Sequence, residues 1–163
     1  RQPLEPGAVI PFAGGNLHLK WLDGGRRGAS RDGDRLLVGG PRDSFARSVE
    51  QWLKREALAV LSAETARVAA LAGVTVASVG IGDPVSRWGS CTSAGAIRYS
   101  WRLILAPPEG LQFVVAHEVA HRLHLNHGPD FKAVEKRLFG GPVAPARALL
   151  RELAPALRSV GRS

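Results

Sequence analysis

The chain has 163 residues, of which 45% are hydrophobic, and it carries a formal net charge of +8. This length and composition fit one compact domain whose core needs no disulfide to hold it together. The single cysteine, Cys91, excludes an internal disulfide and suits a reducing cytoplasm, and no apolar run is long enough for a membrane span. The numbering begins at Arg1 and the chain contains no methionine, so we expect a piece of a longer protein, from which a targeting segment could have been removed.

The positive charge leaves two interpretations open. It could be a footprint for an acidic partner such as a nucleic acid or a nucleotide, or it could be an ordinary solvated surface. The basic residues are scattered, and the densest groups are Arg26-Arg27 with Arg31 and Arg35, and Lys132 with Lys136-Arg137.

Residues 1–42 show the pattern of short strands separated by tight turns. Apolar or alternating runs lie at 9–12, 17–21 and 36–38, and turn signals rich in glycine separate them. We expect three strands here.

Residues 43–73 predict one long helix. Apolar side chains recur at helical spacing from Phe45 to Leu71, with Asp43 or Ser44 as the N-cap, Ala72 as the last helical residue and Gly73 as the stop.

Residues 74–163 predict a small antiparallel sheet followed by helices. The β-rich run 74–81, an extended run through Trp88 and the run 96–101 make up the expected sheet. Helices are expected over 109–125, 129–138 and 144–157, with Pro155 weakening the last. The whole chain, 1–163, is therefore expected to form a single α+β domain whose sheet packs against the second helix.

That second helix carries the sequence His117-Glu118-Val119-Ala120-His121, the His-Glu-x-x-His pattern of zinc hydrolases. Residues four apart share one face of a helix, so both imidazoles can bind one Zn²⁺. Glu118 is rotated away from the ion, and we expect it to act as general base on the metal-bound water. The same residue types could also be ordinary surface hydrogen-bonding groups.

Three residues compete as the third metal ligand. His124 lies two helical turns beyond His117, at a different height on the expected helix. His127 follows Asn126 and precedes Gly128, which can adopt left-handed conformations and turn the chain back toward the site. Glu135 on the next helix is the third alternative. We favour His127.

Several further motifs, in order, resemble those of the YgjP-like metallopeptidase family: Arg87-Trp88-Gly89-Ser90-Cys91, the run 97–103, Pro107, Phe113–His121 and Asn126–Phe131. The resemblance covers at least residues 85–135. It implies a zincin-like metallopeptidase domain, with His117, His121 and His127 as zinc ligands and Glu118 as base. The family is distantly related to SprT-like proteases, which act on proteins near DNA.

The segment 87–91 and Tyr99 have no single interpretation. Arg87–Cys91 could line the cleft and pair with an extended substrate, or Trp88 could be a core aromatic with Arg87 bound to a carboxylate. Cys91 could be a fourth ligand or an inhibitory thiolate, although a plain buried thiol is favoured. Tyr99 could donate to an oxyanion.

Three functions remain possible at this point. The first is hydrolysis of peptide or protein substrates by a zinc metallopeptidase. The second is metal-dependent hydrolysis of nucleotide pyrophosphate bonds by the same site. The third is a nucleic-acid-associated binding module with a non-catalytic zinc, in which four protein ligands would normally close the metal site.

Overall fold

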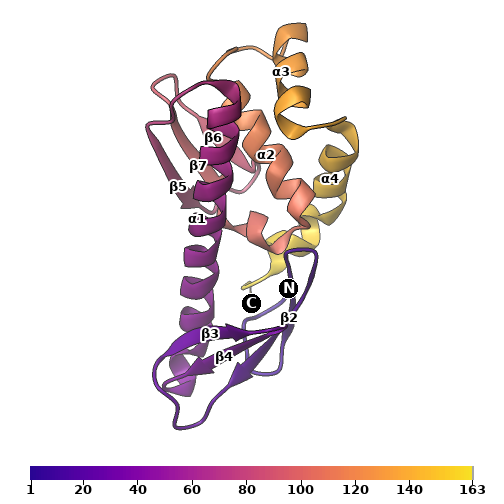
Figure 1. The fold of residues 1–163 in the computed structure, drawn as a ribbon. Coiled ribbons are helices and arrows are strands. Elements are labelled where there is room, and N and C mark those ends of the chain that lie inside the picture. Colours follow the sequence, from indigo (N-terminus) through magenta and orange to yellow (C-terminus); the bar gives the residue numbers. More distant parts are fainter. Residues whose placement is uncertain (163) are drawn as a thin grey trace.

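The computed structural model describes residues 1–162, in which four α-helices combine with a four-stranded and a three-stranded sheet. Helix α1 (Phe45–Ala72) runs from the four-stranded sheet at one end to the three-stranded sheet near the other, and the remaining helices lie beside it (Figure 1). The predicted α+β class is confirmed. No helix in residues 1–162 has the length and apolar character needed to cross a membrane.

The four-stranded sheet has the order β1-β2-β4-β3. The predicted strands are present as β1 (Val9–Phe12), β2 (Gly15–Trp21) and β4 (Arg35–Gly39). Their inward side chains are fully buried because α1 covers this face of the sheet. The edge strand β3 (Gly28–Asp32) was not predicted, since its sequence is mostly exposed and lacks apolar alternation. Only its pairing with β4 defines it.

Helix α1 agrees closely with its prediction. It begins at Phe45, directly after a short 3₁₀ turn over Arg42–Ser44, and ends at Ala72. Gly73 has a φ of 70°, the left-handed conformation that commonly ends a helix and that glycine adopts without strain.

The three-stranded sheet differs from its prediction. Its strands are β5 (Ser78–Gly82), β6 (Gly89–Cys91) and β7 (Ala96–Ser100), in the order β5-β7-β6. β7 is antiparallel to β6 but parallel to β5, so the expectation of an antiparallel sheet was wrong for one pair. The cause is the connection after β5, which leads to β6 at the opposite edge of the sheet. A hairpin then places β7 between β6 and β5. The strand predicted over 74–81 begins only at Ser78.

A short 3₁₀ turn (Trp101–Leu105) leads into α2 (Pro108–Ala120), α3 (Pro129–Phe139) and α4 (Ala144–Ser159). The last two agree with their predictions, and Pro155 is accommodated inside α4. The predicted continuation of α2 to Leu125 was wrong, because tighter i→i+3 hydrogen bonds replace the α-helical pattern after Ala120. Arg122 lies just beyond the helix end, and its guanidinium donates to the carbonyls of Thr75 and Ser93.

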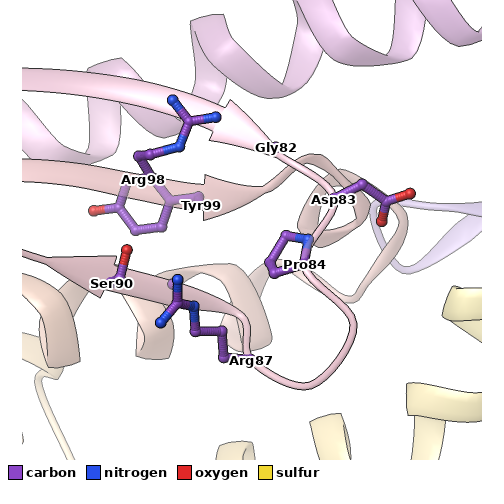
Figure 2. Close-up of a pocket in the computed structure, with 8 residues that line it drawn as sticks. Gly82, Asp83, Pro84, Arg87, Ser90, Arg98 and Tyr99 are labelled. Carbon is purple, nitrogen blue, oxygen red and sulfur yellow. The ribbon is translucent and has the colours of Figure 1, made fainter.

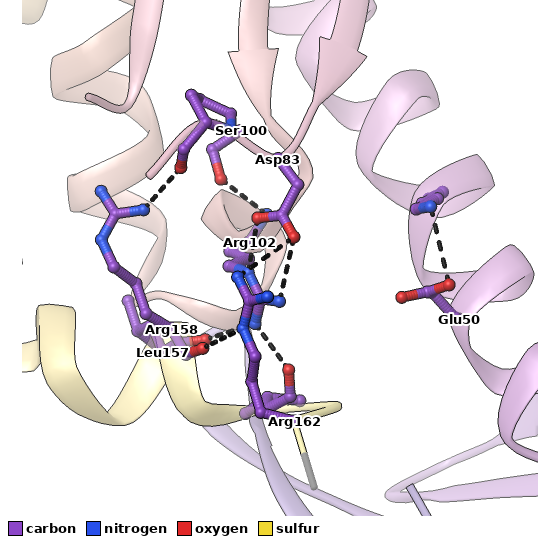
Figure 3. Close-up of polar contacts among 10 residues, drawn as sticks. Glu50, Asp83, Ser100, Arg102, Leu157, Arg158 and Arg162 are labelled. Carbon is purple, nitrogen blue, oxygen red and sulfur yellow. Dashed lines mark hydrogen bonds and ion pairs between the residues drawn. The ribbon is translucent and has the colours of Figure 1, made fainter. Parts of the chain in front are cut away.

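The chain end is attached through one buried guanidinium. Arg102 is 2% exposed and binds both carboxylate oxygens of Asp83, at 2.8 and 3.2 Å. It also donates to the carbonyls of Leu157 and Val160 at the end of α4 (Figure 3). Since these partners come from two segments far from Arg102 in the sequence, this network holds the β5–β6 loop and the end of α4 against the core.

Candidate metal centre

Three imidazoles converge at the end of α2. One ring nitrogen from each of His117, His121 and His127 lies within 4.8 Å of the others, and the Nε2 atoms of His121 and His127 are 3.0 Å apart. Two nitrogens about 2.0–2.1 Å from a tetrahedral zinc ion lie roughly 3.3 Å apart. Three neutral nitrogen donors at this spacing therefore suit a divalent ion such as zinc.

The backbone conformation that brings His127 to this cluster differs from the predicted left-handed turn. Within residues 1–162, Ala13 is the only non-glycine residue with positive φ, and Gly128 has a φ of −75°, so neither Asn126 nor Gly128 is left-handed. The helix ends earlier instead, at Ala120, and the turn that begins at His121 carries the chain back. His124 lies beyond the end of α2 and is not among the three clustered histidines.

The histidines are held by groups behind them. Glu135, on α3 and 1% exposed, lies 2.5 Å from Nδ1 of His117, which leaves Nε2 of that ring for a metal. The His124 carbonyl lies 3.3 Å from Nδ1 of His121. Such contacts orient metal-binding imidazoles and select their tautomer. Glu135 thus occupies a supporting position rather than that of the third ligand considered from the sequence.

One aromatic side chain, that of Phe131, contacts all three histidines. The ring of Phe131 packs against all three imidazoles, with centroid distances of 5.1, 4.7 and 4.7 Å. Burial and the nearby His117 lower the pKa of His121, and this favours the neutral imidazole that binds metals. Sequence reasoning gave no role to Phe131. The only signal for it was its place shortly after the Asn126-His127 turn.

Glu118 lies next to this cluster and is 5% exposed. Burial raises the pKa of its carboxyl, Glu135 adds to that effect, and His117 and Arg87 oppose it. No group in residues 1–162 donates a hydrogen bond to it. Gly89 of β6 faces it so closely that a Cβ there would lie 3.0 Å from Cγ and Oε2 of Glu118.

An open cavity of about 280 Å³ adjoins both groups, lined by Gly89, Ser90, Cys91, Thr92, His117, Glu118, His121 and Leu125. The cleft interpretation of the segment 87–91 therefore agrees with the structure. Cys91 is half-buried and stands outside the three-histidine group, and burial raises the pKa of its thiol. A thiol with a raised pKa is a poor metal ligand at neutral pH.

The other interpretations of nearby residues change in detail. Trp88 is half-buried rather than a core residue, and Arg158 lies over its ring. The Tyr99 hydroxyl is buried and hydrogen-bonded to Oγ1 of Thr65 at 2.8 Å. Its role toward an oxyanion stays a prediction.

A second cavity, of about 320 Å³, lies beside the first on the exposed face of the small sheet. Figure 2 shows Arg87, Ser90 and Arg98 around it. The guanidinium of Arg98 lies over Gly80 and Gly82 and donates to the Ile81 carbonyl at 2.7 Å. In residues 1–162, neither Arg87 nor Arg98 has a carboxylate within 4.0 Å, so both can bind an anion.

A family model described as YgjP-like, metallopeptidase domain, matches residues 1–152. Among the curated proteins and the solved structures, none matches the chain.

Proposed function

The chain belongs to the YgjP-like metallopeptidase family, and on this basis we propose that it hydrolyses peptide bonds with one zinc ion held by His117, His121 and His127. The observation that carries the proposal is the convergence of three imidazoles beside the buried carboxylate of Glu118, which lines an open cavity together with His117 and His121.

The donor set supports a catalytic rather than a structural ion. A structural zinc is normally closed by four protein ligands, whereas a catalytic zinc keeps one position open. The group found in residues 1–162 contains three such residues, and Cys91 is not among them. A zinc ion bound there would lower the pKa of a coordinated water to about 7 and polarise the scissile carbonyl.

Glu118 supplies the proton transfer in this proposal. Its carboxylate accepts a proton from the attacking water and returns that proton to the leaving amine. A base with a raised pKa suits both steps, because it holds a proton more readily than an exposed carboxylate does. Glu135 keeps His117 in place during both steps.

The edge of β6 offers a place for the substrate main chain. β6 pairs only with β7, so its second edge is free of any strand in residues 1–162. Gly89, Ser90 and Cys91 line the same cavity as His117 and Glu118. A peptide added as a further strand would thus lie across the carboxylate and the three histidines.

A second candidate function is the hydrolysis of nucleotide pyrophosphate bonds by the same groups. The observation in its favour is the pair Arg87 and Arg98, which line one cavity next to the site without a carboxylate partner. Guanidinium groups bind phosphate well. Turnover of nucleoside triphosphates that disappears in Glu118→Gln would support this candidate.

The test combines metal analysis with two variants. The wild type is expected to hold about one zinc per chain, and His117→Ala is expected to lose it. Glu118→Gln should keep the zinc but lose about 10²–10⁴-fold in peptide turnover, the usual contribution of a general base. Full turnover in Glu118→Gln would refute its assigned role. Unaltered zinc content in His117→Ala would refute the metal site.

A further inference from the structure

A groove leads away from the metal centre between α2, α4 and the start of β6. Its inner part, about 200 Å³, is lined by Arg87, Trp88 and Gly89 together with Phe113, Val114, His117 and Glu118. Its outer part, about 320 Å³, shares Trp88 and Phe113 with the inner part and continues along α4. The two parts thus form one path that ends at Glu118. We call it the arginine groove.

Arginines make up the walls of this groove. Arg147, Arg151 and Arg158 of α4 line the outer part, and Arg87 lines the inner part. The guanidinium of Arg158 lies 4.3 Å from the ring centroid of Trp88, and that of Arg147 lies 5.4 Å from that of Phe113. No acidic side chain lines the outer part in the described chain.

These guanidinium groups are largely without anionic partners. Arg147 lies 3.6 Å from Glu135, a carboxylate already bound to His117. Arg158 donates to the Pro84 carbonyl, which carries no net charge. Within residues 1–162, Arg87 and Arg151 have no ion pair. Three of the four positive charges around this path therefore have no ion pair among the described residues, and the fourth, on Arg147, shares a carboxylate that already binds His117.

We propose that the arginine groove binds an acidic segment of the peptide substrate, so that the site prefers peptides with Asp or Glu on one side of the scissile bond. This inference rests on the proposed function and names its substrate class. Carboxylates match the forked donors of arginine. The apolar residues that line the groove, such as Phe113 and Leu150, can contact the methylene groups of the Asp or Glu side chains.

A peptide fits the groove better than single-stranded nucleic acid does. Proteins that bind single strands present aromatic faces on which bases stack. Here Arg158 covers the ring of Trp88, while Phe113 is buried between Arg147 and the edge of Phe139. Arg147 and Arg151 are exposed, Arg158 is half-buried against Trp88, and the rings are not free, an arrangement that suits carboxylates.

The test measures binding without requiring turnover. The Glu118→Gln variant of the 163-residue chain is titrated against a fluorescent Asp/Glu-rich peptide, its Asn/Gln counterpart and a single-stranded oligonucleotide of similar length. The acidic peptide should bind at least about tenfold more tightly than the amide peptide, with the difference shrinking as salt rises. Arg151→Glu should reduce that preference by about tenfold, since a repulsion replaces an attraction. The control Arg55→Glu, an exposed arginine on α1 away from the groove, should not.

Each outcome has a defined meaning. Equal affinity for the two peptides, or equal effects of the Arg151 and Arg55 variants, would overturn the inference. Tighter binding of the oligonucleotide with the same dependence on Arg151 would overturn it in favour of a nucleic-acid ligand. Selective binding of the acidic peptide by a protein whose wild type cleaves no peptide would support the groove and refute the proposed function, so the two failures are distinguishable.

Discussion

Two regions of this chain hold charged side chains that are almost completely buried, and they treat them in opposite ways. Arg102 donates to both oxygens of Asp83 and to two main-chain carbonyls, so its charge is fully compensated. Glu118 is buried to a similar degree but receives no hydrogen bond within residues 1–162, and it faces an open cavity. A compensated buried charge stabilises a fold, whereas an uncompensated charge beside a cavity is available for chemistry. The variants below test this contrast.

The largest effect is expected from removing Arg102, the buried charge that is fully compensated. Arg102→Met would leave two buried carbonyls without their donor and the Asp83 carboxylate with only the longer contact to Arg162, at 3.5 Å. We expect a loss of about 3 kcal/mol in the free energy of unfolding, at the low end for a broken buried pair because the Asp83 side chain is 33% exposed. Denaturant unfolding measures this loss. Arg35→Met breaks the exposed pair with Asp32 and should cost less than about 1 kcal/mol. Equal losses would contradict the contrast.

In the metal centre, the substitution Gly89→Ala adds one methyl group next to Glu118 and is expected to lower kcat. The Cβ of Gly89→Ala would press on Cγ and Oε2 of Glu118 and displace the carboxylate. A displacement of about 1 Å costs on the order of 100-fold in rate, and a contact at 3.0 Å requires a smaller shift than that. We expect kcat to fall by about tenfold while zinc content and KM change little. Gly141→Ala, where a Cβ meets nothing within 4 Å, is the control. An unchanged kcat in Gly89→Ala would show that Glu118 needs no fixed position.

An effect of similar size, on zinc affinity rather than on rate, is expected at Glu135, which is buried yet belongs to the site. Glu135→Gln keeps the volume but weakens the hold on Nδ1 of His117. The affinity for zinc should fall by about tenfold or somewhat more, as for other groups that support metal ligands. Competition with a chelator measures it, with Glu56→Gln on α1 as the matched control. A large loss of stability in the metal-free protein, with zinc affinity unchanged, would mean that Glu135 stabilises the fold, as Arg102 does, and does not support the metal site.

The sequence predicted the parts of the site that depend on local spacing. His117, Glu118 and His121 follow from a helix, because residues four apart share a face whatever the rest of the fold does. The long helix and its end at Gly73 were predictable for the same reason. The choice of His127 agrees with the cluster in the structure, although the chain reaches it by an earlier helix end than expected.

The remaining features depend on contacts between distant residues. Asp83 and Arg102 are 19 residues apart, and nothing in their local sequence marks them as partners. The role of Glu135 behind His117 and the close approach of Gly89 to Glu118 arise only when α3 and β6 pack against α2. The parallel pairing of β5 with β7 likewise depends on a crossover that strand propensity does not encode.

The smallest expected effect concerns the acid stability of the compensated pair. The hydrogen bond from Arg102 is the largest cause that lowers the pKa of the Asp83 carboxyl from its ordinary value of 3.8. A lowered pKa in the folded state means that ionised Asp83 stabilises the fold fully above the ordinary value and loses this contribution as the pH falls through the lowered one. Asp83→Asn keeps an oxygen acceptor but cannot ionise. The difference in unfolding free energy between wild type and Asp83→Asn should therefore be constant from pH 5 to pH 7, at about 1 kcal/mol because Asp83 is partly exposed, and should shrink below about pH 4. Denaturant unfolding at each pH measures this difference, and Asp32→Asn at the exposed pair should show little difference at any pH. If the difference for Asp83→Asn grew toward acid instead, the carboxylate would be destabilised in the fold, and the pairing with Arg102 could not be what compensates its charge.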